Sequence, residues 1–239
     1  MRAIFLACAL TALAGCAAQP SRPVASNHSV DKVLEAAMQA NMPDVALRMA
    51  SEQVDRNPSD AIALVHQADA YRAMGREAAA EAAYKRALLI NPDNMHAQIG
   101  MGSVLLHRDP AAAEAAFRSV LTHQPQNPQA LTGLGIAQDL RGEHHAAQVS
   151  YRAALSARPD LQAARVDLGL SLAVSGQSSE ALALLQPAAG DRPMTRQERD
   201  DLAVALAAAG RNDEALRILG EEMSDEDAHS TLAAYRQLF

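Results

Sequence analysis

The sequence predicts an all-α protein: a right-handed α-solenoid of about six helix–turn–helix units, closed by a C-terminal capping helix. Prolines recur at positions 58, 92, 125, 159 and 193, so they are spaced by 34, 33, 34 and 34 residues. A fixed period in this range is the signature of a repeat architecture. Alanine is abundant, aromatic residues make up 3% of the chain and tryptophan is absent, which favours closely packed helices.

The first segment, MRAIFLACALTALAGC, predicts a signal peptide over residues 1–15. Arg2 precedes an uncharged run from Ala3 to Ala14, which is shorter than the roughly 20 residues of a membrane-spanning helix. The order of charged, apolar and small residues is that of a secretory signal. Leu13-Ala14-Gly15-Cys16 resembles the bacterial lipobox, whose cysteine is lipidated. We therefore expect lipidation at Cys16; the alternative is an ordinary cleaved signal.

Residues 16–26 are expected to form the lipidated N-terminus and a flexible polar linker. The chain has two cysteines, and Cys8 leaves with the signal peptide. Cys16 then has no partner within the chain, so an internal disulfide is excluded and the exported fold must be held by packing alone.

The repeat array is expected to span residues 27–223. Proline lacks an N–H and disfavours helix at the preceding residue, so each repeat proline ends one helix and begins a turn. Counting back from the prolines gives units at 27–60, 61–94, 95–127, 128–161, 162–195 and 196–223.

Each unit repeats a pattern of small and large side chains. One position is alanine in all six units: Ala46, Ala80, Ala113, Ala147, Ala181 and Ala215. A larger apolar residue follows four residues later in five of them: Tyr84, Phe117, Tyr151, Leu185 and Leu219. The same face continues with Ala87, Val120, Ala154 and Ala188, and the first helices carry small residues at Ala68, Gly102, Gly135, Gly169 and Ala203. Small residues let the two helices of a unit cross closely, while the large residue fills the gap to the next unit.

Glycines mark the turn inside most units. Gly75, Gly142, Gly176 and Gly210 are expected to end the first helix in the left-handed C′ conformation. Unit 95–127 lacks this glycine and one residue. There we expect Asp109 to cap the second helix and Pro110 to be its first residue.

The pattern resembles the tetratricopeptide repeat (TPR), a 34-residue helix–turn–helix unit. The resemblance covers residues 27 to about 220 and is strongest over 61–161. The consensus tryptophan is replaced in every unit, by Val30, Leu64, Gln98, Leu131, Arg165 and Arg199. Unit 27–60 also has Leu34 and Ala50 where a small and a large residue are expected, and terminal repeats of such arrays are often atypical.

Residues 224–239 have no repeat proline and are expected to form a C-terminal capping helix. SDED supplies an N-cap and acidic first-turn residues, and an amphipathic helix from about 225 to 238 places Leu232, Tyr235 and Leu238 on one face. Such a helix would seal the last repeat. The alternative is a docking helix for a partner.

The first helices of stacked pairs line a concave face, the usual place for a protein partner. The fifth and ninth positions of each unit are expected to point there. In the four central units these are Val65, Asp69, Ile99, Ser103, Thr132, Ile136, Val166 and Leu170, between Asp31 and Glu35 at one end and Asp200 and Val204 at the other. The apolar centre suits an amphipathic helix or an extended hydrophobic segment, and it lacks the Lys, Arg and Asn side chains that grip a C-terminal carboxylate. The alternative is that these residues pack against the next repeat.

Composition and motifs argue against other classes. The net charge is −7 and the only lysines are Lys32 and Lys85, so nucleic acid is not an expected partner. GLSLA at 169–173 and GLGIAQ at 133–138 fall in predicted helices, so neither is a nucleophile elbow or a dinucleotide loop. His144 and His145 are expected in an inter-helix turn with both rings facing solvent. We therefore expect a non-enzymatic protein with no cofactor, no metal and no small-molecule substrate.

The C-terminal segment, RQERDDLAVALAAAGRNDEALRILGEEMSDEDAHSTLAAYRQLF, resembles the end of the TadD family, the TPR lipoproteins of tight-adherence (Tad, Flp-type) pilus assembly. The shared features are LAxALAxxGRxDEA, a short acidic stretch and YRxL. The resemblance implies an outer-membrane lipoprotein of a Gram-negative cell that faces the periplasm. It further implies that the groove binds a protein partner, a secretin or another pilus-machine subunit. Ala17 after the lipidated cysteine implies the same location.

Two alternatives remain open at this stage. One is a pilotin-like lipoprotein of a type IV pilus or type II secretion system. The other is an adaptor for an envelope enzyme, such as a peptidoglycan hydrolase or a protease.

Overall fold

The computed structural model describes residues 27–186 and 194–238 of the chain. In these ranges the regular structure is helical, with turns between the helices and no strand. Twelve helices form consecutive pairs: α1 (Asn27–Gln39) and α2 (Pro43–Arg56), α3 (Ala61–Ala73) and α4 (Glu77–Ile90), α5 (Met95–Leu105) and α6 (Pro110–His123), α7 (Pro128–Leu140) and α8 (His144–Ala157), α9 (Gln162–Val174) and α10 (Ser178–Leu185), α11 (Arg196–Ala208) and α12 (Asn212–Leu219). A final helix, α13 (Asp225–Tyr235), continues into a 3-10 turn (Arg236–Leu238). The predicted all-α solenoid fold is confirmed. Cys16, Ala188 and the repeat proline at 193 lie outside the described residues.

Three turns between units are built around capping side chains that follow the repeat prolines. Asp60, Asn94 and Asn127 each stand two residues after a repeat proline and precede α3, α5 and α7. Each side chain accepts hydrogen bonds from backbone N–H groups of the first helical turn, at 3.0 Å. The proline stops one helix and the cap starts the next, which fixes the repeat length.

The turns inside units have the predicted backbone. The four predicted C′ glycines have positive φ angles: 68° at Gly75, 75° at Gly142, 80° at Gly176 and 71° at Gly210. Asn41 takes this role in the first unit, with φ 54°. In the unit without the glycine, the Asp109 side chain accepts the Ala112 N–H at 3.0 Å and Pro110 is the first residue of α6. Both predictions for this turn are confirmed.

Large residues of the second helices pack into spaces that small residues leave in the first helices. A Cβ atom on Gly135 would come within 2.5 Å of the Tyr151 ring of the same unit, and one on Gly102 within 2.8 Å of the Phe117 ring. The large residues also reach the following unit. A Cβ atom on Gly133 would meet the Phe117 ring at 2.4 Å. One aromatic ring therefore contacts both its own unit and the next.

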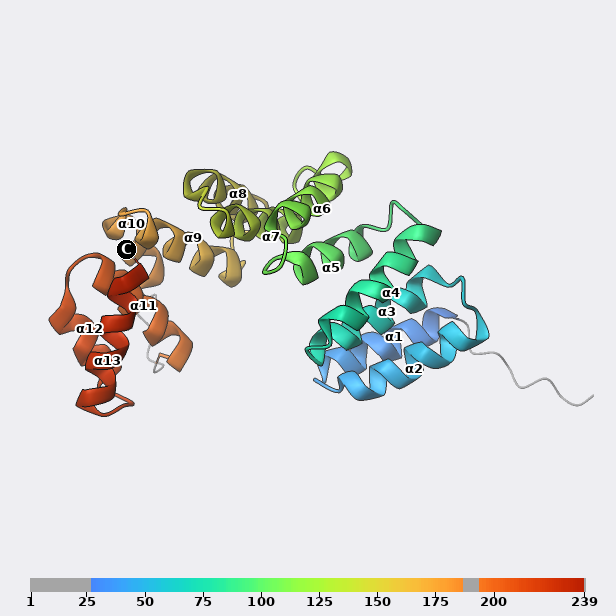
Figure 1. The fold of residues 1–239 in the computed structure, drawn as a ribbon, viewed down its shortest axis with the longest axis horizontal. Coiled ribbons are helices and arrows are strands. Elements are labelled where there is room, and N and C mark those ends of the chain that lie inside the picture. The colour runs from blue at the N-terminus through green and yellow to red at the C-terminus, as the bar shows by residue number, and fades with distance from the viewer. Residues whose placement is uncertain (1–26, 187–193, 239) are drawn as a thin grey trace, which may run out of the picture.

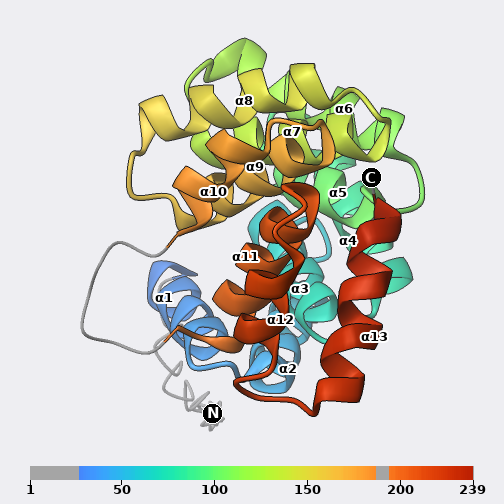
Figure 2. The ribbon, with the colours of Figure 1, turned by 90° about the vertical axis from the view of Figure 1, so that its left-hand side faces the viewer.

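The helix pairs stack into an arch (Figure 1). Neighbouring pairs contact one another along their first helices, from α1 and α3 through to α9 and α11, besides the contacts that join each second helix to the next pair. Helices α5, α7, α9 and α11 lie on the inner side of the arch, and their partners α6, α8, α10 and α12 lie on the outer side. Figure 2 views the arch from its C-terminal end, with α11 to α13 in front.

Helix α13 packs on α11 and α12 at the end of the array. It buries Ala228 and Leu232 in the same core cluster as these helices, and Tyr235 is half-buried against it. The Ser224 hydroxyl caps the helix by accepting the Asp227 N–H at 3.2 Å. The apolar end of the last repeat is thereby covered.

Candidate functional site

The candidate site is the inner face formed by the first helices α3, α5, α7, α9 and α11. The predicted groove residues differ in their exposure there. Val65 and Asp69 are buried, with exposed fractions of 4% and 8%, and offer little open surface. Ile99, Ser103, Thr132, Ile136, Val166 and Leu170 are all half-buried.

The half-buried apolar residues lie at the margin of the core. Ile99 packs against the cluster that contains Phe117, whereas Ile136, Val166 and Leu170 pack against the C-terminal core cluster. The two hydroxyl groups are engaged with their own helices: Ser103 donates to the Ile99 carbonyl at 2.9 Å and Thr132 to the Pro128 carbonyl at 2.8 Å. These residues therefore combine core packing with partial exposure.

Asp69, the first acidic residue of this face, serves as the hydrogen-bond acceptor of a buried tyrosine, Tyr84. The Tyr84 hydroxyl donates a hydrogen bond to the Asp69 carboxylate, and Nε2 of His96, at the start of α5, lies 2.9 Å from the same carboxylate. Burial opposes ionisation of Asp69, but the hydrogen bond and charge of His96 and the Tyr84 hydroxyl together lower its pKa. The same hydrogen bond to Asp69 raises the pKa of His96, although burial opposes this. Burial and the nearby Asp69 raise the pKa of Tyr84.

A second tyrosine has an equivalent arrangement in α7 and α8. The Tyr151 hydroxyl donates to Oδ2 of Asp139 at 3.0 Å. Oδ1 of the same carboxylate accepts the Ser171 hydroxyl of α9 at 2.8 Å and lies 2.9 Å from Nδ1 of His144. Asp139 thus holds α7, α8 and α9 together. The expectation that His144 faces solvent from a turn is wrong: it begins α8 and is half-buried against Asp139, whereas His145 is exposed.

The unit with phenylalanine at this position lacks the carboxylate. The residues of this unit that correspond to Asp69 and Asp139 are Ser103 and Leu106, and Phe117 has no hydroxyl group that needs an acceptor. A buried tyrosine hydroxyl needs an acceptor. Sequence reasoning assigned Asp69 to a groove and missed this dependence, although the co-occurrence of tyrosine and aspartate within two units was visible in the sequence.

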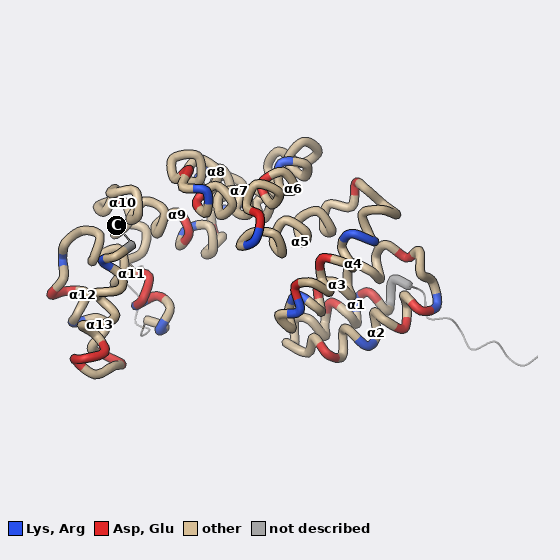
Figure 3. The backbone as a smooth tube through the Cα atoms, viewed as in Figure 1, with Lys and Arg blue, Asp and Glu red and all other residues tan. Residues whose placement is uncertain are grey.

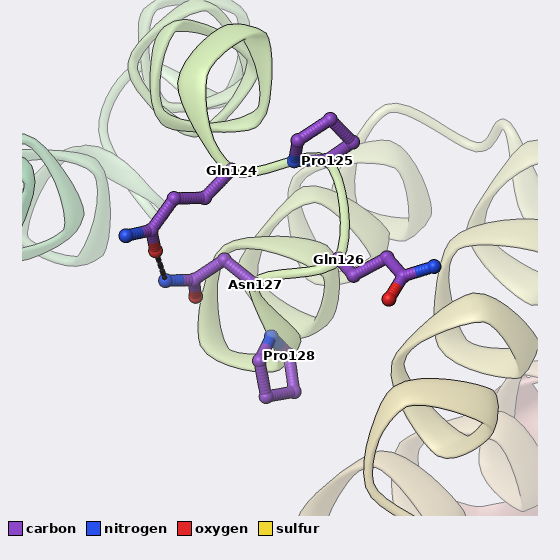
Figure 4. Close-up of a pocket in the computed structure, with 5 residues that line it drawn as sticks. All are labelled: Gln124, Pro125, Gln126, Asn127 and Pro128. Carbon is purple, nitrogen blue, oxygen red and sulfur yellow. Dashed lines mark hydrogen bonds between the residues drawn. The ribbon is translucent and has the colours of Figure 1, made fainter.

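Three further features were candidates for a ligand, catalytic or membrane site: a surface hollow, two glycine-containing motifs and the described helices themselves. Residues 124–128, between α6 and α7, line an open hollow in which Gln124 accepts a hydrogen bond from the Asn127 side chain at 2.8 Å (Figure 4). One exposed, consecutive segment forms this hollow, so no second element shapes it. GLSLA lies within α9, as predicted, and GLGIAQ lies within α7. Over residues 27–186 and 194–238 there is no cluster of three metal-ligating side chains, and none of the helices is long and apolar enough to cross a membrane.

Family models for the tetratricopeptide repeat match residues 61–94, 105–162 and 166–230. The chain belongs to the tetratricopeptide repeat family. TPR folds are protein-interaction scaffolds, so the inner face is the first place to look for a bound protein. No curated protein matches the sequence.

Solved structures share the fold at low sequence identity. PilW, described as a widely conserved type IV pilus biogenesis factor, has a TM-score of 0.73 at 18% identity, over 81% of this chain and 90% of that chain. A TPR protein from Parabacteroides merdae has a TM-score of 0.67 at 15% identity, over 92% and 86%. YrrB, a TPR protein with an unusual peptide-binding site, has a TM-score of 0.56 at 20% identity, over 79% and 97%. At these identities the likeness concerns the fold.

Proposed function

We propose that the protein is a lipid-anchored TPR scaffold at the periplasmic face of the outer membrane, which binds a subunit of a Tad (Flp-type) pilus machine and assists its assembly or localisation. The partner is a secretin or another subunit of that machine. The observation that carries the proposal is the structural likeness to PilW, a type IV pilus biogenesis factor, over 81% of this chain. The C-terminal resemblance to the TadD family supports the Tad machine in particular.

The anchor in this proposal is Cys16. A lipid on this cysteine would hold the N-terminus at the membrane, and residues 16–26 would separate it from α1. Eleven residues at up to about 3.3 Å each span roughly 36 Å when extended. The inner face of the array would therefore act close to the membrane surface.

Replacing the anchor residue tests the location. We expect Cys16→Ser to move the protein from the membrane fraction to the soluble periplasmic fraction, because the only lipid attachment site is lost. Cys8→Ser is the matched control, since it removes the other cysteine, within the signal peptide. A Cys16→Ser protein that stays in the membrane fraction would contradict the lipid anchor.

Deleting the gene tests the machine. We expect loss of pilus-dependent adhesion together with a secretin that is absent or misplaced in the outer membrane. Adhesion lost with a normally placed secretin would point to another pilus subunit as the partner. Normal adhesion would contradict the pilus role, and would leave the pilotin-like lipoprotein of a type II secretion system or the adaptor of an envelope enzyme.

A further inference from the structure

Two further aspartates on the inner helices differ from Asp69 and Asp139, because neither accepts a hydrogen bond from a tyrosine hydroxyl in the described part of the chain. Asp167 of α9 and Asp201 of α11 are 34 residues apart and occupy the sixth position of their units. Their units carry Leu185 and Leu219 at the large-residue position, so neither aspartate serves a tyrosine of its own unit. We call Asp167 and Asp201 the position-six aspartates.

The sixth position is the place where the large residue of the preceding unit packs. In α5 and α7 this position is Gly100 and Gly133, and a Cβ atom there would come within 2.3 Å of Tyr84 and 2.4 Å of Phe117. The two central units, 95–127 and 128–161, therefore use glycine at this buried position. In α9 and α11 it carries carboxylates instead, which is the opposite of what close packing requires.

Neither position-six aspartate has a full set of hydrogen-bond partners in the described part of the chain. Asp201 is 7% exposed and its Oδ2 atom is buried without a hydrogen-bond partner; its other polar interaction is with Gln197, one turn earlier. Asp167 is half-buried and receives no hydrogen bond from residues 27–186 or 194–238. A buried carboxylate without partners is unfavourable for folding.

Two cationic side chains of α9 and α11, Arg165 and Arg199, are engaged elsewhere. Arg199, which is 8% exposed, contacts Glu222 and donates to the Met194 carbonyl at 2.6 Å. Arg165, on the same helix as Asp167, hydrogen-bonds Gln162. Burial and the charges of Asp139 and Asp201 raise the pKa of Asp167 to about 6, and no cation of the described chain counters them. Burial and the charges of Asp200 and Glu198 raise the pKa of Asp201, although its hydrogen bond with Gln197 opposes this.

The surroundings of the pair are apolar and half-exposed. Val166, Ile136 and Leu170 lie at the margin of the same core cluster, on α7 and α9. Figure 3 shows acidic residues on the inner helices α7, α9 and α11. A fitting occupant brings a positive charge on a long apolar stem, with apolar residues beside it, which describes lysine or arginine within a hydrophobic segment.

We propose that the position-six aspartates bind a lysine or arginine side chain of a partner protein, whose neighbouring apolar residues pack on Ile136, Val166 and Leu170. This inference rests on the proposed scaffold function and names the chemistry of its partner. A basic side chain would supply the hydrogen bonds that Asp167 and Asp201 lack. A bound metal ion is a poorer fit, because the described residues bring no three ligating side chains together.

A random peptide library tests the proposal without any knowledge of the partner. Phage-displayed dodecapeptides would be selected on the purified chain from residue 16, and in parallel on the Asp167→Asn, Asp201→Asn double variant. We expect the wild-type protein to enrich peptides with lysine or arginine beside apolar residues. We expect the basic preference to disappear on the double variant.

The matched control is Asp93→Asn with Asp160→Asn. These aspartates share one repeat position in two turns, both are exposed, and their replacement changes the net charge by the same amount. The control should retain the basic preference, because general attraction of a basic peptide to an acidic protein depends on net charge alone. If the control loses the preference equally, the effect is non-specific and the proposal is wrong.

One selected peptide then supports a double-mutant cycle. We expect the position-six double variant to bind the peptide at least tenfold more weakly. A peptide whose basic residue is changed to glutamine should lose the same affinity for the wild-type protein. When both changes are combined, the affinity should fall no further than with either change alone. Additive losses would overturn the direct contact, as would enriched peptides without a basic residue or no enrichment at all. Since no pilus is involved, failure of this test and failure of the pilus role are separately visible.

Discussion

Asp69 and Asp167 are two carboxylates on the inner helices of the same array, and their pKa values shift in opposite directions. Asp69, in the N-terminal half, accepts the Tyr84 hydroxyl and pairs with His96, and its pKa is lowered. Asp167, in the C-terminal half, is near Asp139 and Asp201 without a cation, and its pKa is raised to about 6. Burial opposes ionisation in both cases, so the neighbours decide the sign.

The difference shows which acidic residues the fold itself needs. Asp69 and Asp139 are acceptors for buried tyrosine hydroxyls, which makes them part of the core. Asp167 and Asp201 accept no tyrosine hydroxyl and occupy a position where the two central units have glycine. Groups that a fold holds at a cost to its own stability are concentrated at functional sites. The C-terminal half of the inner face is therefore the better candidate for binding.

The largest expected effect comes from placing an aspartate, which the two C-terminal units carry at the sixth position, at the sixth position of a central unit. Gly133→Asp would place a Cβ atom and a carboxylate against the Phe117 ring, where a Cβ atom alone would approach to 2.4 Å. An uncompensated buried charge typically costs about 3–5 kcal/mol, and we expect a loss of this size in the free energy of unfolding by urea. Gln129→Asp, an exposed change on the same helix, is the control and should be near neutral. A stable Gly133→Asp variant would show that the sixth position has room for a carboxylate in every unit.

The second prediction removes the unpaired charge. Asp167→Asn should stabilise the protein at pH 7, because the folded state no longer holds an ionised carboxylate beside Asp139 and Asp201. The pKa rises from 3.8 to about 6 on folding. At about 1.4 kcal/mol per pKa unit, the gain is on the order of 2–3 kcal/mol.

The pH dependence gives this prediction its sign. A carboxyl group with a raised pKa keeps its proton longer in the folded than in the unfolded state, so wild-type stability falls as the pH rises from about 4 to about 6. The gain of Asp167→Asn should therefore be small at pH 4.5 and complete at pH 7. Chemical denaturation at both pH values measures it, with the exposed Asp160→Asn as control. A gain that is equal at both pH values would contradict the raised pKa.

The sequence was sufficient for the features that depend on one unit alone. The repeat prolines, the C′ glycines and the Asp109–Pro110 turn each act within a few residues, and the structure has them as predicted. The pairing of small with large residues, such as Gly135 with Tyr151, also follows from spacing inside one unit.

The missed features depend on contacts between units or between side chains. The role of Asp139 needs its simultaneous contact with Tyr151 and His144 of α8 and with Ser171 of α9. The sixth position becomes meaningful only when the ring of the preceding unit is known to pack there. A signal existed nonetheless, because aspartates 34 residues apart at 167 and 201 align with glycines at 100 and 133.

The smallest expected effect concerns the paired carboxylate. Tyr84→Phe removes the hydroxyl that donates to Asp69 but leaves His96 in place. A hydrogen bond to a charged group typically contributes about 1.5–3 kcal/mol, and we expect a loss near the lower end because the phenyl ring keeps its packing. Since the pKa of Asp69 is lowered on folding, its stabilisation is present above the unfolded pKa and is lost as the pH falls through the folded value. The loss of stability from Tyr84→Phe should accordingly be present at pH 7 and shrink below pH 4. The gain from Asp167→Asn, by contrast, should shrink as the pH falls from about 6 to about 4. If both variants showed the same pH dependence, the two halves of the inner face would not differ in the way their charges are held.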